Sequence, residues 1–424
     1  MLDRLFFLSL LLNMTGLFRF IAPQVNMSIG QVSIALLSFN FLYLFSRSGL
    51  AVFFLKKSKM LPWLFLLLLW PLATVAYAPS LNLREIGLQV YFFSLFLGTL
   101  VWIYRNGLDA VYRLYAISLA LTVFGMALSK LVPGFFEAVA VLADANVPGE
   151  TVGARPVGFF LQPNNLAIAL LLLFVGWFGL WREKSAWREV LAIVLFLALE
   201  LATGSRAGIM VGVGITGVYL MHNWRQRLAR GRLLYWLGLF LTLFVLLIFG
   251  MRAYLGATGS TVTGTSSGDL IDRLENMIYF RFSPEESLAK DTSIQLRYIA
   301  QKDALDLIIK KPVHGYGHGA DLYFLETGRL LLSAHSQFLT GALQYGIFYS
   351  LAFLVSVFLF LKNKFRIQVE SQLGSNIVVQ FVFVFAVLFI YSSILELRLF
   401  YIILGVIAAL LWFPAHLFRF DART

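Results

Sequence analysis

Long apolar runs separated by short polar segments dominate this sequence. Each run is close to the roughly 20 residues that an α-helix needs to cross the hydrocarbon core of a membrane. The pattern predicts an all-α polytopic membrane protein with about twelve transmembrane helices. The predicted spans lie near residues 5–21, 28–46, 61–78, 86–104, 114–132, 163–181, 190–204, 207–221, 233–250, 336–361, 376–394 and 399–418. The seventh and eighth are short and meet at TGSRAG (203–208), which predicts a tight re-entrant corner.

Basic residues between the runs predict the orientation of the chain. If the N-terminus lies inside, every short inner loop carries lysine or arginine, as the positive-inside rule requires. The inner basic residues are then Arg4, Arg47, Lys56, Lys57, Lys59, Arg105, Arg113, Arg182, Lys184, Arg188, Arg225, Arg227, Arg230, Arg232, Lys362, Lys364, Arg366, Arg419 and Arg423. Both termini are therefore predicted to be cytoplasmic. The long segment 251–334 falls on the outer side, and loops of that length are exempt from the rule.

Composition agrees with this class of protein and excludes others. Of the 424 residues, 59% are hydrophobic and 13% are charged, whereas soluble domains contain about 25% charged residues. The net charge of +12 is spread between the apolar runs and is not gathered on one face, so no nucleic-acid partner is expected. The absence of cysteine excludes disulfides and cysteine-ligated metal centres. No small-residue cleavage site follows the first apolar run, so we expect a retained helix and one integral membrane domain over 1–424.

The outer segment 251–334 contains its own predicted elements. It opens with a stretch rich in glycine, serine and threonine (256–269), which is predicted to be mobile. An amphipathic helix is predicted over about 293–310, with Ser293 as its cap and Pro312 beyond its end. Its apolar positions are Ile294, Ile299, Leu305, Ile308 and Ile309. A glycine-rich turn, HGYGHGA (314–320), follows.

Three arginines are candidates for binding phosphate. Arg206 lies in the predicted corner, Arg297 on the polar side of the predicted outer helix, and Arg155 before the sixth span. A guanidinium is always charged and binds phosphate oxygens in a bidentate manner, so arginines that converge would suit a diphosphate. The alternatives are an interfacial anchor for Arg206, a solvated helix face for Arg297 with Asp291 or Asp303 as partner, and no site role for Arg155.

Histidines supply the second set of candidates. His335 precedes the tenth span, with Ser333 as a predicted cap, and the partial positive charge of a helix N-terminus favours a neutral imidazole that can act as a general base. The alternative is a polar residue that merely ends the span. His314 and His318 are four residues apart, as metal ligands on a helix would be, but the intervening glycines predict a tight turn and no metal site.

Several catalytic motifs are missing from suitable elements. The outer segments carry no Asp-x-Asp pair, and the sequence shows no phosphate-binding loop, HExxH or GxSxG in a suitable place. Arginines would then stabilise the charge on a departing diphosphate in place of a metal ion.

Four motifs occur in an order that resembles the O-antigen ligase superfamily, which also contains O-antigen polymerases and some protein O-glycosylases. They are GFFLQPNNLAIALL (158–171), LATGSRAGIMV (201–211), the Arg297 helix running into KKPVHGYGHG (310–319), and AHSQFLTGALQYGIFYSL (334–351). The resemblance covers about 158–351. It implies an all-helical glycosyltransferase of the C type that takes a glycan from undecaprenyl diphosphate without a metal or other cofactor.

The resemblance also implies roles for individual residues. It assigns Arg206 and Arg297 to the diphosphate and His335 to activation of the acceptor. We expect five further residues to contribute to substrate binding: Arg155, Asn164, Asn165, Glu200 and His318. Glu200 would orient Arg206, or else pair with another buried residue. Many members have asparagine after the histidine, whereas this chain has Ser336, which removes one polar partner.

The sequence therefore predicts an O-antigen ligase of the bacterial inner membrane with a periplasmic active site. It would transfer the glycan to a hydroxyl of lipid A–core oligosaccharide in one inverting displacement. Three alternatives remain open: an O-antigen polymerase, a protein O-oligosaccharyltransferase and a small-solute transporter. A transporter would often show paired half-repeats, which are not seen here.

Overall fold

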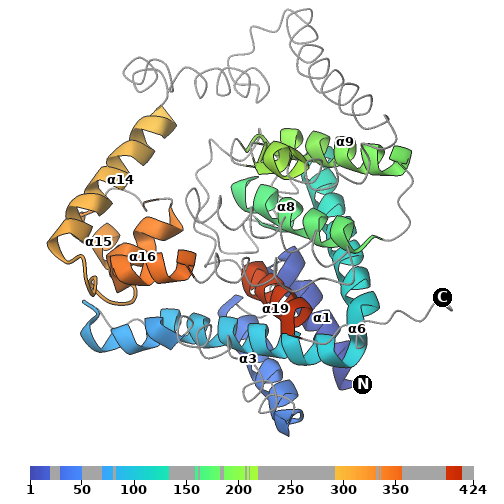
Figure 1. Ribbon diagram of the computed structural model, residues 1–424, viewed down its shortest axis with the longest axis horizontal. Helices are drawn as coiled ribbons and strands as arrows, with labels where there is room; N and C mark the ends of the chain where they lie inside the picture. The colour runs from blue at the N-terminus through green and yellow to red at the C-terminus, as the bar shows by residue number, and fades with distance from the viewer. Residues whose placement is uncertain are drawn as a thin grey trace, which may run out of the picture. The chain divides into compact units, whose positions relative to one another are not determined.

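Helices make up all the regular structure in the part of the chain that the computed structural model describes (Figure 1). That part comprises residues 1–19, 29–49, 69–79, 83–132, 158–160, 163–181, 186–205, 208–209, 211–217, 292–330, 334, 336–355 and 398–412. The α-helices are α1 (Leu2–Thr15), α3 (Ile29–Phe45), α6 (Leu83–Leu131), α8 (Pro163–Leu180), α9 (Ala186–Thr203), α14 (Thr292–Lys310), α15 (Ala320–Glu326), α16 (Gln337–Tyr345) and α19 (Arg398–Trp412). Two 3₁₀ turns, η1 (Val75–Tyr77) and η3 (Gly158–Phe160), complete the set. The all-α prediction is confirmed for these residues.

One described helix, Ile86–Leu131 within α6, is long and apolar enough to cross a membrane. It covers two predicted spans, 86–104 and 114–132, and its backbone leaves helical geometry at Gly107, where φ is 71° and ψ is −175°. The predicted inner loop is therefore a sharp break between two helices. Shorter apolar helices occur at Gly30–Phe45, Asn164–Leu180 and Arg398–Ala409. The predicted spans at 233–250 and 376–394 lie outside the described residues.

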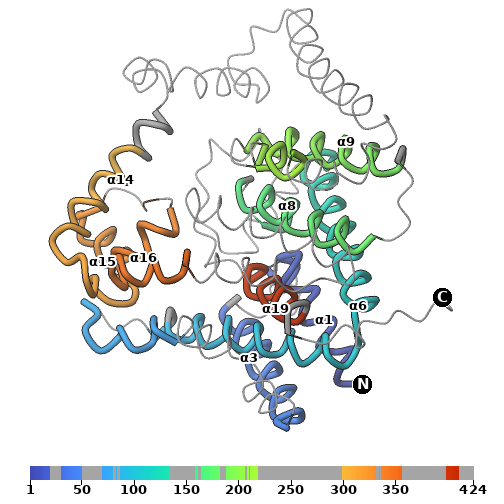
Figure 2. The backbone as a smooth tube through the Cα atoms, in the orientation of Figure 1, coloured from blue at the N-terminus to red at the C-terminus, as the bar shows by residue number. Residues whose placement is uncertain are grey.

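The chain divides into two compact units. The first unit consists of Met1–Met14, Ser28–Leu114 and Thr292–Thr424, and the second of Thr15–Met27 and Tyr115–Asp291. Figure 2 traces the backbone of both, coloured along the chain. The prediction of one integral membrane domain stays a prediction.

In the first unit, small residues bring α1, α3, α6 and α19 close together. The ring of Phe6 on α1 stacks on Tyr43 of α3 at a centroid distance of 4.1 Å, and it also lies where a side chain on Gly98 of α6 would be. A methyl group at Gly405 of α19 would meet the backbone oxygen of Phe96 at 3.0 Å. Glycine at such positions allows helices in a membrane protein to pack closely.

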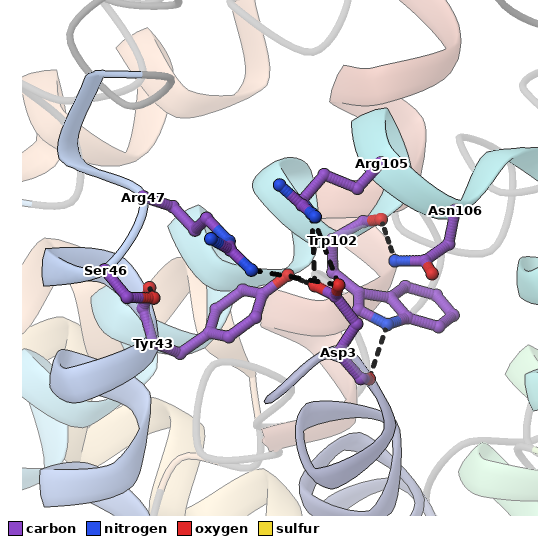
Figure 3. Close-up of polar contacts among 7 residues, drawn as sticks. All are labelled: Asp3, Tyr43, Ser46, Arg47, Trp102, Arg105 and Asn106. Atoms are coloured by element: carbon purple, nitrogen blue, oxygen red, sulfur yellow. Dashed lines mark hydrogen bonds and ion pairs between the residues drawn. The ribbon is translucent and has the colours of Figure 1, made fainter. Parts of the chain in front are cut away.

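Asp3 joins three of these helices at one end of the first unit (Figure 3). The Tyr43 hydroxyl donates to Asp3 Oδ1 at 2.8 Å, Arg105 Nε lies 3.2 Å from the same carboxylate, and Arg47 lies 4.0 Å away. The indole nitrogen of Trp102 donates to the Asp3 backbone oxygen. Asp3, Arg47 and Arg105 all belong to segments predicted to lie on the same side of the membrane, so the cluster agrees with that orientation.

A second polar network lies deeper among the same helices. Arg398 of α19 donates to Asn13 Oδ1 at 3.2 Å and to the Ser33 hydroxyl at 2.8 Å. Its guanidinium also lies over the Tyr91 ring, and the Tyr91 hydroxyl donates to Asn13. The network ties α19 to α1, α3 and α6 and satisfies polar groups that would be costly if buried without partners.

The second unit is built on α8 and α9, which pack side by side (Figure 2). Phe174 of α8 and Phe196 of α9 stack at 4.1 Å with nearly parallel rings. The buried Tyr115 ring lies against Gly176, where any side chain would collide with it. These aromatic contacts pack α9 against α8. The C-terminal end of α9 then leads into the predicted corner.

Candidate functional site

The predicted corner is present in the second unit. Helix α9 ends at Thr203, Gly204 has a φ of +65°, and helical backbone is present again at Gly208. Thr203 Oγ1 accepts a hydrogen bond from the Ser205 N–H at 3.1 Å, and Ser205 Oγ accepts one from the Gly208 N–H at 3.3 Å. Ser205 thus satisfies a backbone donor in the manner of an N-cap. Arg206 itself lies outside the described residues.

Glu200 is the buried acid of this corner. Its side chain is fully buried on α9, and a methyl group at Gly208 would lie 2.5 Å from Oε2 and 2.8 Å from Ala167. Neither carboxylate oxygen has a hydrogen-bond partner among the described residues. A carboxyl group in such surroundings requires a charge partner or a proton.

The other predicted residues near the start of α8 are only partly described. Asn164 and Asn165 lie in the first turn of α8, the former exposed and the latter half-buried. The preceding η3 is buried against the helix that contains Gly125. Arg155 lies outside the described residues. The two asparagines are thus at a helix end, where the unpaired backbone N–H groups favour negatively charged ligands.

The glycine-rich turn after α14 belongs to the first unit and is attached to α16 through its backbone. Tyr316 N–H donates to the Leu343 carbonyl at 2.9 Å, and Gly317 N–H donates to the Gln344 carbonyl at 2.8 Å. Gly315, Gly317 and Gly319 all have positive φ angles. A methyl group at Gly315 would lie 2.5 Å from the Gln344 carbonyl oxygen. The predicted tight turn is confirmed. Its conformation favours glycine at all three positions, and Gly315 also lacks the space for a side chain.

Residues 74–78 support the same turn from the other side. The Tyr77 hydroxyl donates to the His314 carbonyl at 2.8 Å, and the Tyr77 ring meets the His314 imidazole edge-on. A methyl group at Gly317 would lie 2.6 Å from the Ala78 α-carbon. The turn therefore fits between α16 and the end of the third predicted span, a contact that the sequence did not predict.

His318 lies in a buried polar cluster formed with α15 and α16. Its Nδ1 is 2.7 Å from the Tyr345 hydroxyl, and Gln344 donates to the Asp321 carboxylate. Burial raises the pKa of Asp321, while the hydrogen bond from Gln344 and the nearby His318 act in the opposite direction. His314, by contrast, is exposed and contacts Tyr77. The two histidines thus have different neighbours, and no group of three or more metal-binding side chains occurs in the described parts of the chain.

Ser336 caps α16, and this corrects the prediction that placed the cap at Ser333. Its side chain accepts a hydrogen bond from the Leu339 N–H at 3.4 Å. Asparagine is an equally good N-cap, so the Ser336 departure from many family members preserves the cap. His335 immediately precedes Ser336 and lies outside the described residues.

The tenth predicted span, 336–361, is also corrected. Helix α16 ends at Tyr345, and Gly346 has a φ of +89° before helical backbone resumes. A methyl group at Gly346 would overlap the Val313 carbonyl, and Ile347 N–H donates to the Pro312 carbonyl at 2.8 Å. The break is therefore imposed by contact with the glycine-rich turn. A glycine within a long apolar run was the only signal in the sequence.

Helix α14 begins at Thr292, so Ser293 lies in its first turn and is not its cap. Its buried positions are Ala300, Ala304 and Ile308, and the helix packs against α16. The prediction that Arg297 lies on the polar side of this helix stays a prediction. Only the backbone of Arg297 is described. The packing thus brings the helix that carries Arg297 onto the helix that follows His335.

Comparison with protein families matches residues 191–354 to the family described as O-antigen ligase. Over that segment, the sequence is similar to the O-antigen ligase family. No curated protein matches the chain. The matched segment contains Glu200, the corner, α14, the glycine-rich turn and α16. Asn164, Asn165 and Arg155 fall before it.

The match to the O-antigen ligase family supports a broad class of activity. It supports a membrane enzyme of the glycosyltransferase kind, of ligase or polymerase type, that acts on lipid-linked glycans. The apolar helix in α6 agrees with a membrane protein.

Proposed function

We propose that this chain is an O-antigen ligase of the bacterial inner membrane. It would transfer a glycan from undecaprenyl diphosphate to a hydroxyl of lipid A–core oligosaccharide at the periplasmic face. The observation that carries the proposal is that the family match spans 191–354, which contains all three predicted catalytic residues, Arg206, Arg297 and His335. Two described elements next to Arg206 and His335, the corner and the capped start of α16, support the proposal.

In the proposed site, Arg206 and Arg297 hold the donor diphosphate. Two guanidinium groups would offset the negative charge that grows on the departing diphosphate, so the displacement would need no metal ion. Glu200 would orient Arg206. Its support is the buried carboxylate that faces the start of the helix after the corner at Gly208.

His335 is proposed to accept the proton from the acceptor hydroxyl. The hydroxyl oxygen then attacks the anomeric carbon, the bond to the diphosphate oxygen breaks, and its electron pair leaves with undecaprenyl diphosphate. A single displacement of this kind inverts the anomeric centre. The position immediately before the Ser336 cap supports the role, because a helix N-terminus disfavours a protonated imidazole.

The remaining predicted residues take supporting roles in the proposal. Asn164 and Asn165 at the start of α8, together with Arg155, would contact polar groups of the substrates. His318 is buried against Tyr345, which favours shaping of the glycine-rich turn over direct contact with the glycan.

The membrane arrangement is part of the same proposal. About twelve helices would span the membrane, both termini would be cytoplasmic, and 251–334 would form a periplasmic loop. The cluster around Asp3 supports it, since it joins three segments assigned to the cytoplasmic side (Figure 3).

Reconstitution with defined substrates tests the reaction. The purified chain in liposomes receives undecaprenyl-diphosphate glycan, lipid A–core and a chelator, and the products are separated by size. A ligase yields glycosylated lipid A–core in the presence of the chelator. Chain growth on a second lipid-linked repeat instead would make the protein a polymerase, and transfer to a protein hydroxyl would make it an O-oligosaccharyltransferase. Flux of a solute without transfer would support a transporter.

A further inference from the structure

Helix α14 exposes a second apolar stripe on the side away from its buried face. Tyr298, Leu305 and Ile309 are 52%, 46% and 72% exposed. Their spacing of seven and four residues places them in one row along the helix. Val313, just past the helix end, is 60% exposed and extends the row. Leu305 and Ile309, which were predicted as apolar positions of this helix, thus lie on its exposed side. Alanines form most of its buried side.

Basic side chains interrupt and end this row. Lys302 is exposed and lies four residues after Tyr298, within the row itself. Lys310 and Lys311 are exposed at the end of the helix, and the Lys311 ammonium lies over the Tyr316 ring. We call the set Tyr298, Lys302, Leu305, Ile309 and Val313 the outer stripe.

The chemistry of the outer stripe fits a lipid surface better than a protein partner. A partner protein that covered Leu305 and Ile309 would also bury charged side chains, namely Lys302 and, one turn later, Asp306. That burial is costly unless the partner supplies matching charges. At a bilayer surface, the aliphatic side chains enter the acyl boundary while lysine reaches phosphate and water. Tyrosine is enriched at the same depth. Residues 191–354, which include α14, match a family of membrane proteins, so such a surface lies within reach of this helix.

We propose that α14 lies along the membrane with its outer stripe inserted among anionic phospholipid headgroups. This interaction surface goes beyond the proposed function and does not depend on catalysis. Arg297 immediately precedes Tyr298, so the two positions are about 100° apart around the helix. The stripe thereby sets the Arg297 backbone at headgroup level, the level at which a lipid-linked diphosphate lies.

Site-directed spin labelling tests this surface directly, because the chain has no cysteine of its own. Leu305→Cys and Ile309→Cys are labelled in the full-length protein in liposomes that contain phosphatidylglycerol. Thr327→Cys, at an exposed polar position after α15, is the matched control. We expect collisions with oxygen to exceed those with a water-soluble nickel complex at 305 and 309, and the reverse at 327. Labels at 305 and 309 that behave as the label at 327 would overturn the proposal. So would labels shielded from both reagents, because these indicate a protein contact.

A change of charge at Lys302 tests whether the lipid surface that contacts the outer stripe is anionic. Lys302→Glu replaces attraction to phosphate by repulsion, whereas Lys302→Arg keeps the charge. We expect the oxygen preference at position 309 to fall several-fold in the glutamate variant and to persist in the arginine variant. An oxygen preference that is equal in both variants would overturn the assignment to anionic lipid. Transfer activity plays no part in either measurement, so failure of the ligase proposal would leave these results unaffected.

Discussion

At the scale of single residues, glycines in the turn region differ in what surrounds them. Gly346 and Gly319 both have positive φ angles, but a side chain at Gly346 would overlap the Val313 carbonyl, whereas Gly319 faces open space. Positive φ alone costs a non-glycine residue about 1–2 kcal/mol. Gly319→Ala should therefore lower the apparent melting temperature modestly, and Gly346→Ala should lower it much further. Thermal unfolding in detergent checks this, and equal losses would contradict the packing of Gly346 on Val313.

Glu200 supports a prediction about charge at the corner. Glu200→Gln keeps the size of the side chain and removes its negative charge. If the carboxylate orients Arg206, kcat/KM for the lipid-linked donor should fall by about tenfold or more. Glu189→Gln is the matched control, because Glu189 is another buried acid on α9. A similar change of kcat/KM in the two variants would remove Glu200 from the site.

At the scale of the helix, the start of α16 depends on Ser336. Ser336→Ala should cost about 1 kcal/mol through loss of the cap, and Ser336→Asn should cost little. Because His335 adjoins the cap, transfer activity should fall in the alanine variant and be retained in the asparagine variant. Kinetics and melting temperature measured on both variants check this. Equal activity in the two variants would show that the cap does not support the site.

The helices differ in how well the sequence predicts them. Apolar runs and flanking proline located α3, α8 and the end of α14 to within a few residues, because these signals are local. The break at Gly346 could not be predicted, since its cause is contact with a turn more than 30 residues earlier. The buried face of α14 was also predicted only in part, because Ile308 is buried but Leu305 and Ile309 are exposed. Alanine packs inward there, and the larger Leu305 and Ile309 point outward.

The candidate site was predictable to a similar degree. The corner and the glycine-rich turn were recognised from glycine and serine in short motifs, which encode local conformation. The contacts of Tyr77 with His314 and of Gln344 with Asp321 join distant segments, so no local pattern indicates them.

At the scale of the whole molecule, the absence of native cysteine allows the topology to be mapped. Lys57→Cys lies in a predicted cytoplasmic loop, and Thr327→Cys lies in the predicted periplasmic loop. In intact spheroplasts, a membrane-impermeant maleimide should label position 327 and should label position 57 only after permeabilisation. The reverse pattern would invert the orientation and move the proposed site to the cytoplasmic side.

The proposed mechanism depends on His335 as the base that activates the acceptor, and reconstituted transfer to lipid A–core tests this role most directly. His314→Ala is the matched control, because the exposed His314 bonds Tyr77 through its backbone carbonyl, which the substitution keeps. We predict that His335→Ala lowers the rate of transfer by about 10²–10⁴-fold, the usual contribution of a general base, while His314→Ala stays near wild type. Equal rates in the wild type and His335→Ala would contradict the role of His335 as the general base.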